Sequence, residues 1–253
     1  MRAVVIHAEK DLRVEDAAVP ELGPLDVKVA IKAGGICGSD LHYYLHGGFG
    51  TIRVREPMVL GHEIAGIVEA VGAEVSRVTP GDLVAVNPSR ACGRCRYCQA
   101  GLQQHCLDML FYGSAMRFPH VQGGFREVLV IEEHQAVKLP GHVGAAQAAF
   151  AEPLAVCLHA VKRAGALLGK RVLVTGSGPI GVLTVVAARA AGASEIVVTD
   201  VVDGPLPIAL KMGATTAINV MAQPERLKAE YGAEKGAFDV MFECSGNQHA
   251  LTG

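Results

Sequence analysis

Two cysteine-containing segments carry residue types that bind metals. The first packs a thiol, a hydroxyl, a carboxylate, an imidazole and a phenol into seven residues behind a pair of glycines, namely Cys37, Ser39, Asp40, His42 and Tyr43. A core strand would not carry so many polar groups, and a plain surface turn rarely contains a cysteine. We therefore predict that Cys37 binds a metal ion and that its neighbours tune that site.

The second segment has four cysteines in a C-x2-C-x2-C-x7-C pattern, Cys92, Cys95, Cys98 and Cys106. Four thiolates at this spacing can close a tetrahedron around Zn²⁺ with no coordination position left open. In a reducing compartment, such clustering favours metal binding over disulfides. The pattern predicts a structural zinc site that braces a lobe over about residues 88–110, with an iron–sulfur cluster as the alternative.

Further metal ligands stand elsewhere in the chain. His62 and Glu63 are adjacent where a strand is expected to begin, and both side chains are good ligands for Zn²⁺. Glu152 is another candidate, because it is a carboxylate at the start of an otherwise apolar helix. Its alternative role is to cap that helix through the helix dipole. The residues alone do not decide whether Glu63 or Glu152 is the direct ligand.

The elements that would position these residues fall into two sets. Up to about residue 147, short β-rich runs alternate with Gly-Pro, Pro-Gly and Gly-Gly turns, which is typical of an antiparallel barrel. Strands are expected over residues 4–7, 12–14, 26–33, 63–71, 83–86 and 125–131. An alanine-rich helix is expected over 145–164, with a kink or a second start at Pro153.

From residue 171 the chain alternates between strands and helices, which indicates a parallel sheet. Strands are expected over 171–175, 195–200, 217–220 and 239–243, with helices over 179–191, 205–212 and 224–231. The predicted fold class is therefore α/β with an all-β-rich first domain. The domains are expected at 1–147 and at 148–253, the second with only part of a two-half dinucleotide fold.

A glycine-rich turn joins the first strand of this series to its helix. Gly176, Gly178 and Gly181 form a G-x-G-x-x-G pattern, with Pro179 and Ile180 inside it. Because the pattern follows a buried strand and opens an apolar helix, it predicts that a dinucleotide pyrophosphate binds at the helix N-terminus.

The next strand ends in a carboxylate that bears on coenzyme choice. Asp200 can accept hydrogen bonds from the adenosine ribose and would repel a 2′-phosphate. Residues 201–204 contain no arginine or lysine to bind such a phosphate. The sequence therefore favours NAD over NADP, and the alternative is that Asp200 only caps a helix.

Bulk composition argues against several partner classes. A net charge of −2 with no basic block disfavours nucleic acid and anionic membranes as partners. No apolar run is long enough to span a bilayer, and the chain opens on a strand-like segment rather than a signal peptide. We therefore expect a cytoplasmic protein that acts on small molecules, with no nucleic acid and no membrane partner.

The order of these motifs resembles that of the zinc-dependent medium-chain dehydrogenases. The matching segments are 37–42, 61–66, the four-cysteine lobe and the glycine turn. Cys37 and His62 match the ligands of the catalytic zinc, and Glu63 matches a glutamate that approaches or binds it. The polyol (sorbitol-like) branch carries a glutamate within Glu-Pro-Leu at the position of Glu152, as here.

The resemblance implies an oxidoreductase with a GroES-like barrel and a Rossmann sheet. It implies one catalytic and one structural zinc, a nicotinamide coenzyme, a polyol or sugar-acid substrate and, in full-length members, a homo-oligomer. Ser39 matches a hydroxyl that relays the substrate proton, and His42 would pass the proton outward. Asp40 would orient His62, and Tyr43 would either bind a substrate hydroxyl or pack in the core.

Other interpretations stay open. The chain could be another family member, such as a xylitol, sorbitol or threonine dehydrogenase. It could also be a non-catalytic fragment, because the sequence reads as the front part of a longer enzyme with half of the nucleotide-binding sheet. Arg117 is either a partner for the carboxylate of a sugar acid or a plain surface residue.

Overall fold

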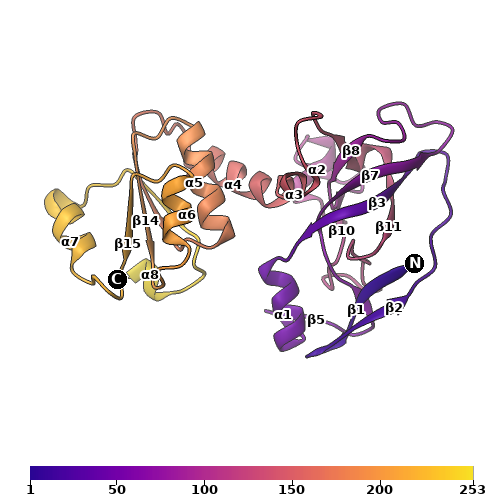
Figure 1. Cartoon of the computed structure of the whole chain (residues 1–253), viewed down its shortest axis with the longest axis horizontal. Coiled ribbons are helices and arrows are strands. Elements are labelled where there is room, and N and C mark those ends of the chain that lie inside the picture. Colours follow the sequence, from indigo (N-terminus) through magenta and orange to yellow (C-terminus); the bar gives the residue numbers. More distant parts are fainter. Residues whose placement is uncertain (253) are drawn as a thin grey trace. The chain divides into compact units, whose positions relative to one another are not determined.

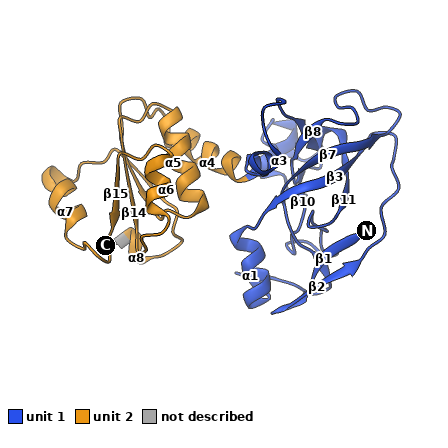
Figure 2. Ribbon diagram, in the orientation of Figure 1, with its two compact units in different colours: residues 1–152 blue, residues 153–253 orange. Residues whose placement is uncertain are grey.

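The computed structural model describes residues 1–252 and divides into two compact units (Figure 2). The first unit spans Met1–Glu152 and the second begins at Pro153. Gly253, the last residue of the second domain expected from the sequence, lies outside the described residues. Among the described residues, none of the helices is both long enough and apolar enough to cross a membrane.

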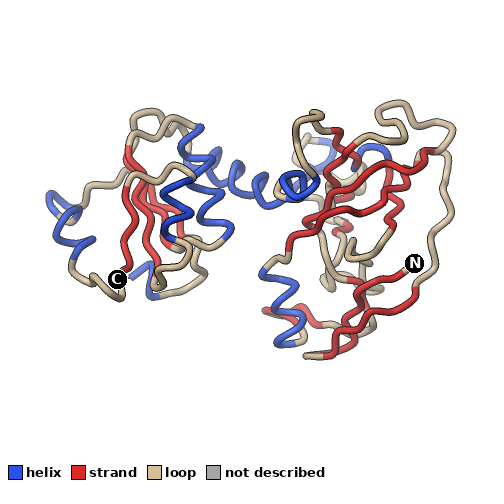
Figure 3. The backbone as a smooth tube through the Cα atoms, viewed as in Figure 1, coloured by secondary structure: helices blue, strands red, loops and turns tan. Residues whose placement is uncertain are grey.

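The first unit is built on a curled antiparallel sheet (Figure 3). Its order is β11-β3-β7-β8-β12, with β3 (Asp26–Gly35), β7 (Glu63–Val71), β8 (Leu83–Val86), β11 (Val128–Glu132) and β12 (Ala136–Lys138). The β3–β7 pairing shifts register twice, and such bulges bend a strand and increase its twist. A core of valine, isoleucine and leucine packs within the curl. This architecture confirms the prediction of an antiparallel, barrel-like first domain.

A smaller sheet completes the framework, in the order β2-β1-β6. Its strands are β1 (Arg2–Ala8), β2 (Asp11–Asp16) and β6 (Met58–Val59). Two-stranded ribbons are formed by β4 (Gly48–Phe49) with β5 (Ile52–Arg53) and by β9 (Ser89–Arg90) with β10 (Leu110–Phe111). Short helical turns are α2 (Arg96–Gln99), η1 (Gln103–His105) and η2 (Glu133–Gln135). The strand expected over 125–131 begins only at Val128, because residues 125–127 bond mainly to β1 and to Leu60.

Helix α1 (Gly38–His46) was not predicted from the sequence, although its end signals are present. Cys37 is the N-cap, and its N–H donates to the Asp40 carboxylate at the third helical position. Gly47 ends the helix in the left-handed conformation, with φ 63°. The polar residues of the segment were interpreted as a metal site, and the capping signals that they also carry were overlooked.

The alanine-rich stretch forms two helices instead of one. Helix α3 (Ala145–Ala149) ends at Phe150, and α4 (Ala151–Ala164) follows directly. Pro153 lies in the first turn of α4, where its missing N–H costs no intrahelical hydrogen bond. Of the two predicted alternatives, a kink or a second helix start, the structure has the second start, which lies at Ala151.

The second unit is a parallel sheet with helices on both faces (Figures 1 and 3). Its order is β15-β14-β13-β16, with β13 (Arg171–Thr175), β14 (Glu195–Asp200), β15 (Thr216–Asn219) and β16 (Val240–Glu243). The helices are α5 (Pro179–Ala190), α6 (Leu206–Lys211), α7 (Arg226–Tyr231), η3 (Ala233–Lys235) and α8 (His249–Thr252). This order matches the first four strands of a dinucleotide-binding sheet, which confirms the Rossmann prediction.

Both faces of this sheet are apolar, as the continuous hydrophobic strands require. Val172 and Val174 of β13 pack in one core cluster with residues of α5 and α6, whereas Leu173 packs in another with Tyr231 of α7. Successive side chains of a strand point to opposite faces, so one apolar run supplies both cores.

Candidate functional site

Three side chains of metal-ligand type meet in the first unit. Cys37, His62 and Glu63 each offer a ligand atom, and these atoms lie within 4.8 Å of one another. Cys37 caps α1, whereas Glu63 begins β7 directly after His62. Gly35 of β3 pairs with Glu63, and a Cβ at Gly35 would collide with the Glu63 carboxylate. Strand pairing and a missing side chain therefore bring Glu63 beside Cys37.

The buried carboxylate of Asp40 joins the two segments that carry the cluster. It is 3% exposed and accepts hydrogen bonds from Cys37 N (3.0 Å) and Gly61 N (3.3 Å). Asp40 Oδ1 lies 3.9 Å from His62 Nδ1, which is longer than a hydrogen bond, and His62 Nδ1 is buried without a hydrogen-bond partner. An imidazole with its Nδ1–H turned toward Asp40 offers its other nitrogen as a ligand.

The electrostatics of the site fit a cation. Burial raises the pKa of the Cys37 thiol above its usual value. Burial likewise raises the pKa values of Asp40, Glu63 and Glu152, although His62 acts in the opposite direction on all three. Burial penalises the ionised forms of these acids, and a bound divalent ion would favour those forms. The thiol, imidazole and carboxylate set is also the donor chemistry of Zn²⁺.

The proposed relay residues lie on α1 with different surroundings. Ser39 acts against burial and lowers the pKa of the Cys37 thiol, so it lies close to that thiol, and His42 is exposed. Tyr43 is 1% exposed, and its hydroxyl accepts a hydrogen bond from Ala115 N (3.0 Å). The expected contact between Tyr43 and substrate does not fit this position, because the phenol is enclosed in the core. Packing is the role that the structure gives to Tyr43.

Glu152 and Arg117 are placed less directly than the sequence suggested. Glu152 lies in the first turn of α4. The charge of His62 lowers its pKa and that of Glu63 raises it, but Glu152 is outside the group of ligand atoms within 4.8 Å. The Arg117 guanidinium forms an ion pair with Asp108. A sugar-acid carboxylate would have to compete with Asp108 for Arg117, which favours the alternative of a plain surface residue.

The four-cysteine lobe gathers its thiols in the described structure. Ligand atoms of Cys92, Cys95, Cys98 and Cys106 lie within 4.8 Å of one another. Cys106 Sγ accepts hydrogen bonds from Cys92 N (3.2 Å) and Asp108 N (3.3 Å). Backbone N–H groups, that of Leu107 most of all, lower the pKa of Cys95 to about 6. Burial raises the pKa of Cys98 to about 12, so the fit to a closed structural zinc site rests on the meeting of the four sulfurs and on the stabilised thiolate of Cys95.

A cavity of about 510 Å³ lies at the carboxyl ends of the parallel strands in the second unit. Its lining includes Thr175, Gly176, Gly178, Asp200, Val220 and Cys244. These residues lie at or just after the ends of all four strands, where the strand order reverses, and ligands of open α/β sheets bind at such a point.

The glycine turn has the features of a dinucleotide cradle. Helix α5 begins at Pro179, followed by Ile180, and Gly178 is its N-cap. The free N–H groups of its first turn therefore face the glycine turn. A Cβ at Gly178 would meet nothing within 4 Å, which leaves room for a ligand, whereas a Cβ at Gly181 would collide with Gly176 O. Thr175 Oγ1 is buried without a hydrogen-bond partner and lines the cavity. These features fit a dinucleotide.

Asp200 lines the same cavity, but the chain already uses its carboxylate. Oδ2 accepts hydrogen bonds from Ser177 N (2.6 Å) and Ser177 Oγ (2.7 Å). Oδ1 accepts them from Val201 N (2.7 Å) and Val202 N (3.1 Å). Burial opposes ionisation, but these bonds outweigh it and lower the pKa of Asp200. Ser177 was not among the residues predicted from the sequence, although its place between two glycines of the turn was the available signal.

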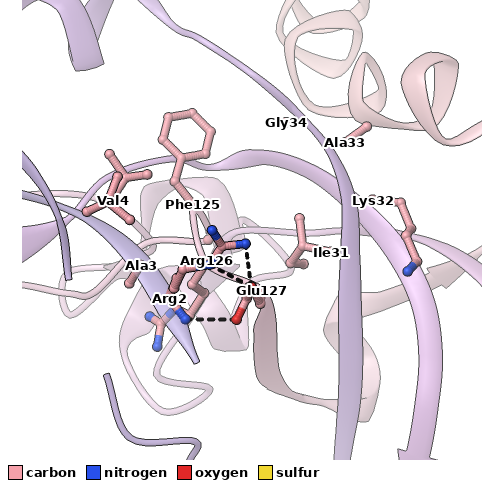
Figure 4. Close-up of a pocket in the computed structure, with 12 residues that line it drawn as sticks. Arg2, Ala3, Val4, Ile31, Lys32, Ala33, Gly34, Phe125, Arg126 and Glu127 are labelled. Carbon is pink, nitrogen blue, oxygen red and sulfur yellow. Dashed lines mark hydrogen bonds and ion pairs between the residues drawn. The ribbon is translucent and has the colours of Figure 1, made fainter. Parts of the chain in front are cut away.

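A separate hollow of about 380 Å³ lies beside β1 and β3 (Figure 4). Its Arg2 forms an ion pair with Glu127 (3.0 Å), and Arg126 Nε donates to Gly123 O (2.7 Å). The Phe125 ring borders the hollow and also packs over glycines of the metal-site segments. Its described lining contains no group of metal ligands, so we assign it no chemistry.

The structure leads to a prediction for Asp40. Cys37 N and Gly61 N each donate to a different oxygen of Asp40. Asparagine has only one side-chain oxygen, so one of these buried N–H groups would face an NH₂ group, and we expect the free energy of unfolding to fall by about 2 kcal/mol. We also expect a 10–100-fold loss of zinc affinity at the Cys37 site, which is the usual cost of removing a partner of a ligand. Urea unfolding and competition with a chelator measure the two effects. The exposed Asp16→Asn change on β2 is the control, and equal behaviour of the two variants would contradict the assigned role.

Comparisons with known proteins agree with this architecture. Residues 23–141 match the alcohol dehydrogenase GroES-like domain, and residues 179–252 match the zinc-binding dehydrogenase family. L-idonate 5-dehydrogenase (NAD(P)(+)) of Escherichia coli (strain K12) is 47% identical over 224 residues, which are 88% of this chain and 64% of that protein. Sorbitol dehydrogenase of Bacillus subtilis (strain 168) is 37% identical over 251 residues, covering 99% of this chain and 70% of that protein.

Solved structures give the same result. The crystal structure of L-idonate 5-dehydrogenase from Escherichia coli str. K-12 substr. MG1655 superposes with a TM-score of 0.92 at 42% identity, covering 99% of this chain and 71% of that one. A zinc-binding dehydrogenase from Sinorhizobium meliloti 1021 bound to NADP gives a TM-score of 0.88 at 35% identity, covering 99% of this chain and 71% of that one.

The chain spans 64% and 65% of the length of two L-idonate 5-dehydrogenases that it matches, from Escherichia coli and Vitis vinifera. Its motifs, its two folds and these matches together show that the chain belongs to the zinc-binding dehydrogenase family with an alcohol dehydrogenase GroES-like domain.

Proposed function

We propose that this protein is a zinc- and NAD-dependent dehydrogenase that oxidises a polyol or sugar acid, with L-idonate and its product 5-keto-D-gluconate as the favoured pair. The observation that carries the proposal is the meeting of Cys37, His62 and Glu63 within 4.8 Å in a buried, acid-rich site. Such a set leaves a coordination position for an alcohol oxygen, unlike the four-cysteine lobe. A cytoplasmic location belongs to the same proposal, because clustered metal-binding thiols suit a reducing compartment.

The chemistry of the bound groups is general to this class of reaction. A zinc ion would act as a Lewis acid toward the substrate hydroxyl, and NAD would accept the hydride. Cys37, His62 and Glu63 would hold the ion in the proposed site, with Glu152 close by. Asp40 would hold the two ligand-bearing segments in register through its bonds to Cys37 N and Gly61 N.

The side chains of α1 suggest how the hydroxyl proton leaves. Ser39 lies two residues from Cys37 and lowers the pKa of its thiol, so Ser39 lies beside the proposed metal site. His42 follows three residues later in the same helix and therefore shares its face. Because His42 is exposed, it can pass to water a proton taken up by Ser39.

The substrate assignment rests on sequence likeness. Segments 34–44, 57–63, 111–116, 118–120, 123–125 and 150–155 resemble L-idonate 5-dehydrogenase. Relatives with sorbitol and D-xylulose in their names are 37–39% identical, which keeps neutral polyols as the second candidate class. NAD is favoured as coenzyme because Asp200 lines the cavity and residues 201–204 carry no cationic side chain. An assembly of identical subunits is also part of the proposal.

A metal count with a substrate panel tests the proposal. We expect two zinc ions per chain, and NAD reduction with L-idonate at a kcat/KM about tenfold or more above that for sorbitol, xylitol or threonine. If the enzyme prefers a neutral polyol or threonine, the L-idonate assignment is wrong and the preferred substrate replaces it. If zinc binds but no alcohol is oxidised, the chain is a binding unit and the enzymatic proposal fails.

A further inference from the structure

The carboxylate of Asp200 has no unused acceptor position. An ionised carboxylate offers about four lone-pair sites for hydrogen bonds. In the structure, four donors occupy them, two on each oxygen, from Ser177 (N and Oγ), Val201 and Val202. A ribose hydroxyl in the neighbouring cavity therefore has to share or take a position that the chain itself occupies.

Only one of these four donors can turn away without moving the backbone. Three are main-chain N–H groups, and the turn that carries Ser177 is anchored to β14 by a bond from Gly176 N to Thr199 O (2.8 Å). The fourth is the Ser177 hydroxyl, which can rotate about χ1. Ser177 is 1% exposed and bonds to Asp200 from the buried side, while Asp200 lines the cavity.

We propose that the Ser177 hydroxyl competes with the adenosine ribose for Asp200 and thereby weakens the preference for NAD over NADP. The inference rests on the proposed function, because it assumes that a nicotinamide dinucleotide occupies the cavity. A ribose 2′-hydroxyl donates to the carboxylate and needs an acceptor position, whereas a 2′-phosphate meets the carboxylate only as a like charge. Ser177 is thus a positioning residue that selectively affects the unphosphorylated coenzyme.

Binding measurements on Ser177→Ala test the inference. Dissociation constants for NADH and NADPH, from nucleotide fluorescence with the full chain, give a selectivity ratio that is independent of turnover. Removing the hydroxyl frees one acceptor position, so we expect tighter NADH binding, nearly unchanged NADPH binding and a ratio of Kd(NADPH) to Kd(NADH) raised about tenfold. A purely structural role would weaken both coenzymes equally and leave the ratio where it was.

Matched variants keep the test decisive. Ser177→Thr retains the hydroxyl and should keep the wild-type ratio, and Ser177→Cys, with its weak donor, should shift the ratio part of the way. If Ser177→Ala does not fold, the shift measured with Ser177→Cys tests the inference in its place. Ser194→Ala removes a hydroxyl that bonds to Gly169 O elsewhere in the unit, and it should leave the ratio unchanged.

Failure of this inference is distinguishable from failure of the proposed function. If the wild-type chain binds both coenzymes and Ser177→Ala lowers the ratio or leaves it unchanged, Ser177 is not a competitor and only the inference is overturned. If the wild-type chain binds neither coenzyme, the proposed function fails and the inference falls with it.

Discussion

Replacing Cys37 with alanine is expected to remove one of two zinc ions per chain and to lower kcat/KM for the alcohol by about three to five orders of magnitude. The change deletes the only thiol in the Cys37–His62–Glu63 group and leaves two ligand side chains within 4.8 Å. The remaining imidazole and carboxylate bind zinc less tightly than the full set of three ligands. Metal analysis and NAD reduction measure the two effects.

The chain offers a matched control for this experiment. Cys157 lies on α4 and is 1% exposed, and it belongs to no group of potential metal ligands in the described structure. Cys157→Ala should therefore keep both zinc ions, with a stability loss as its main effect. Two zinc ions retained by Cys37→Ala would show that Cys37 is not a ligand and would remove the main support for the catalytic proposal.

Replacing Cys95 with alanine should have the opposite profile. It opens the closed set of four thiols, so we expect loss of the structural zinc, retention of the ion at Cys37 and a melting temperature lowered by about 10 °C or more. Between Cys92 and Cys106 the lobe has only two short elements, α2 and η1, so this part depends on the metal for its order. Calorimetry, metal analysis and limited proteolysis of residues 88–110 follow the outcome.

A non-ligand residue of the same lobe separates metal loss from surface effects. Arg94 is exposed, and its only ion pair in the described structure is with Asp108 at 3.7 Å. Surface pairs of this kind contribute little to stability, so Arg94→Ala should retain both zinc ions and the wild-type melting temperature. A Cys95 variant that kept two zinc ions would contradict the structural assignment of the lobe.

Much of the fold was accessible from local patterns. The strand–turn–helix alternation after residue 171 predicted the parallel sheet, with β13 and β14 at the expected bounds, because buried strands and glycine turns leave a signal within a few residues. Helix α1 was missed because its capping residues, Cys37 and Asp40, also belong to the polar cluster and were interpreted only as chemistry. The alanine-rich run carries no local signal at Phe150, so the division into α3 and α4 at this residue was not predicted.

The candidate site was accessible as a set of residues but not as an arrangement. The adjacent pair His62–Glu63 and the thiol of Cys37 stand out by type and spacing. Their meeting depends on the pairing of β3 with β7, which sets Gly35 opposite Glu63. Glu152 was predicted as a ligand from its residue type and its Glu-Pro-Leu motif, yet it lies outside the ligand group. A motif identifies a residue but does not fix its distance from the other ligands.

The sequence by itself determined which chemical groups are available and the local elements that carry them, since cysteine spacing, the glycine turn and strand periodicity act over short stretches. The tertiary structure decided where those groups point. It enclosed Tyr43 in the core and filled the acceptor positions of Asp200 with donors from Ser177, 23 residues away, and from its own turn. Such outcomes depend on contacts between distant segments, and these form only when the whole unit packs.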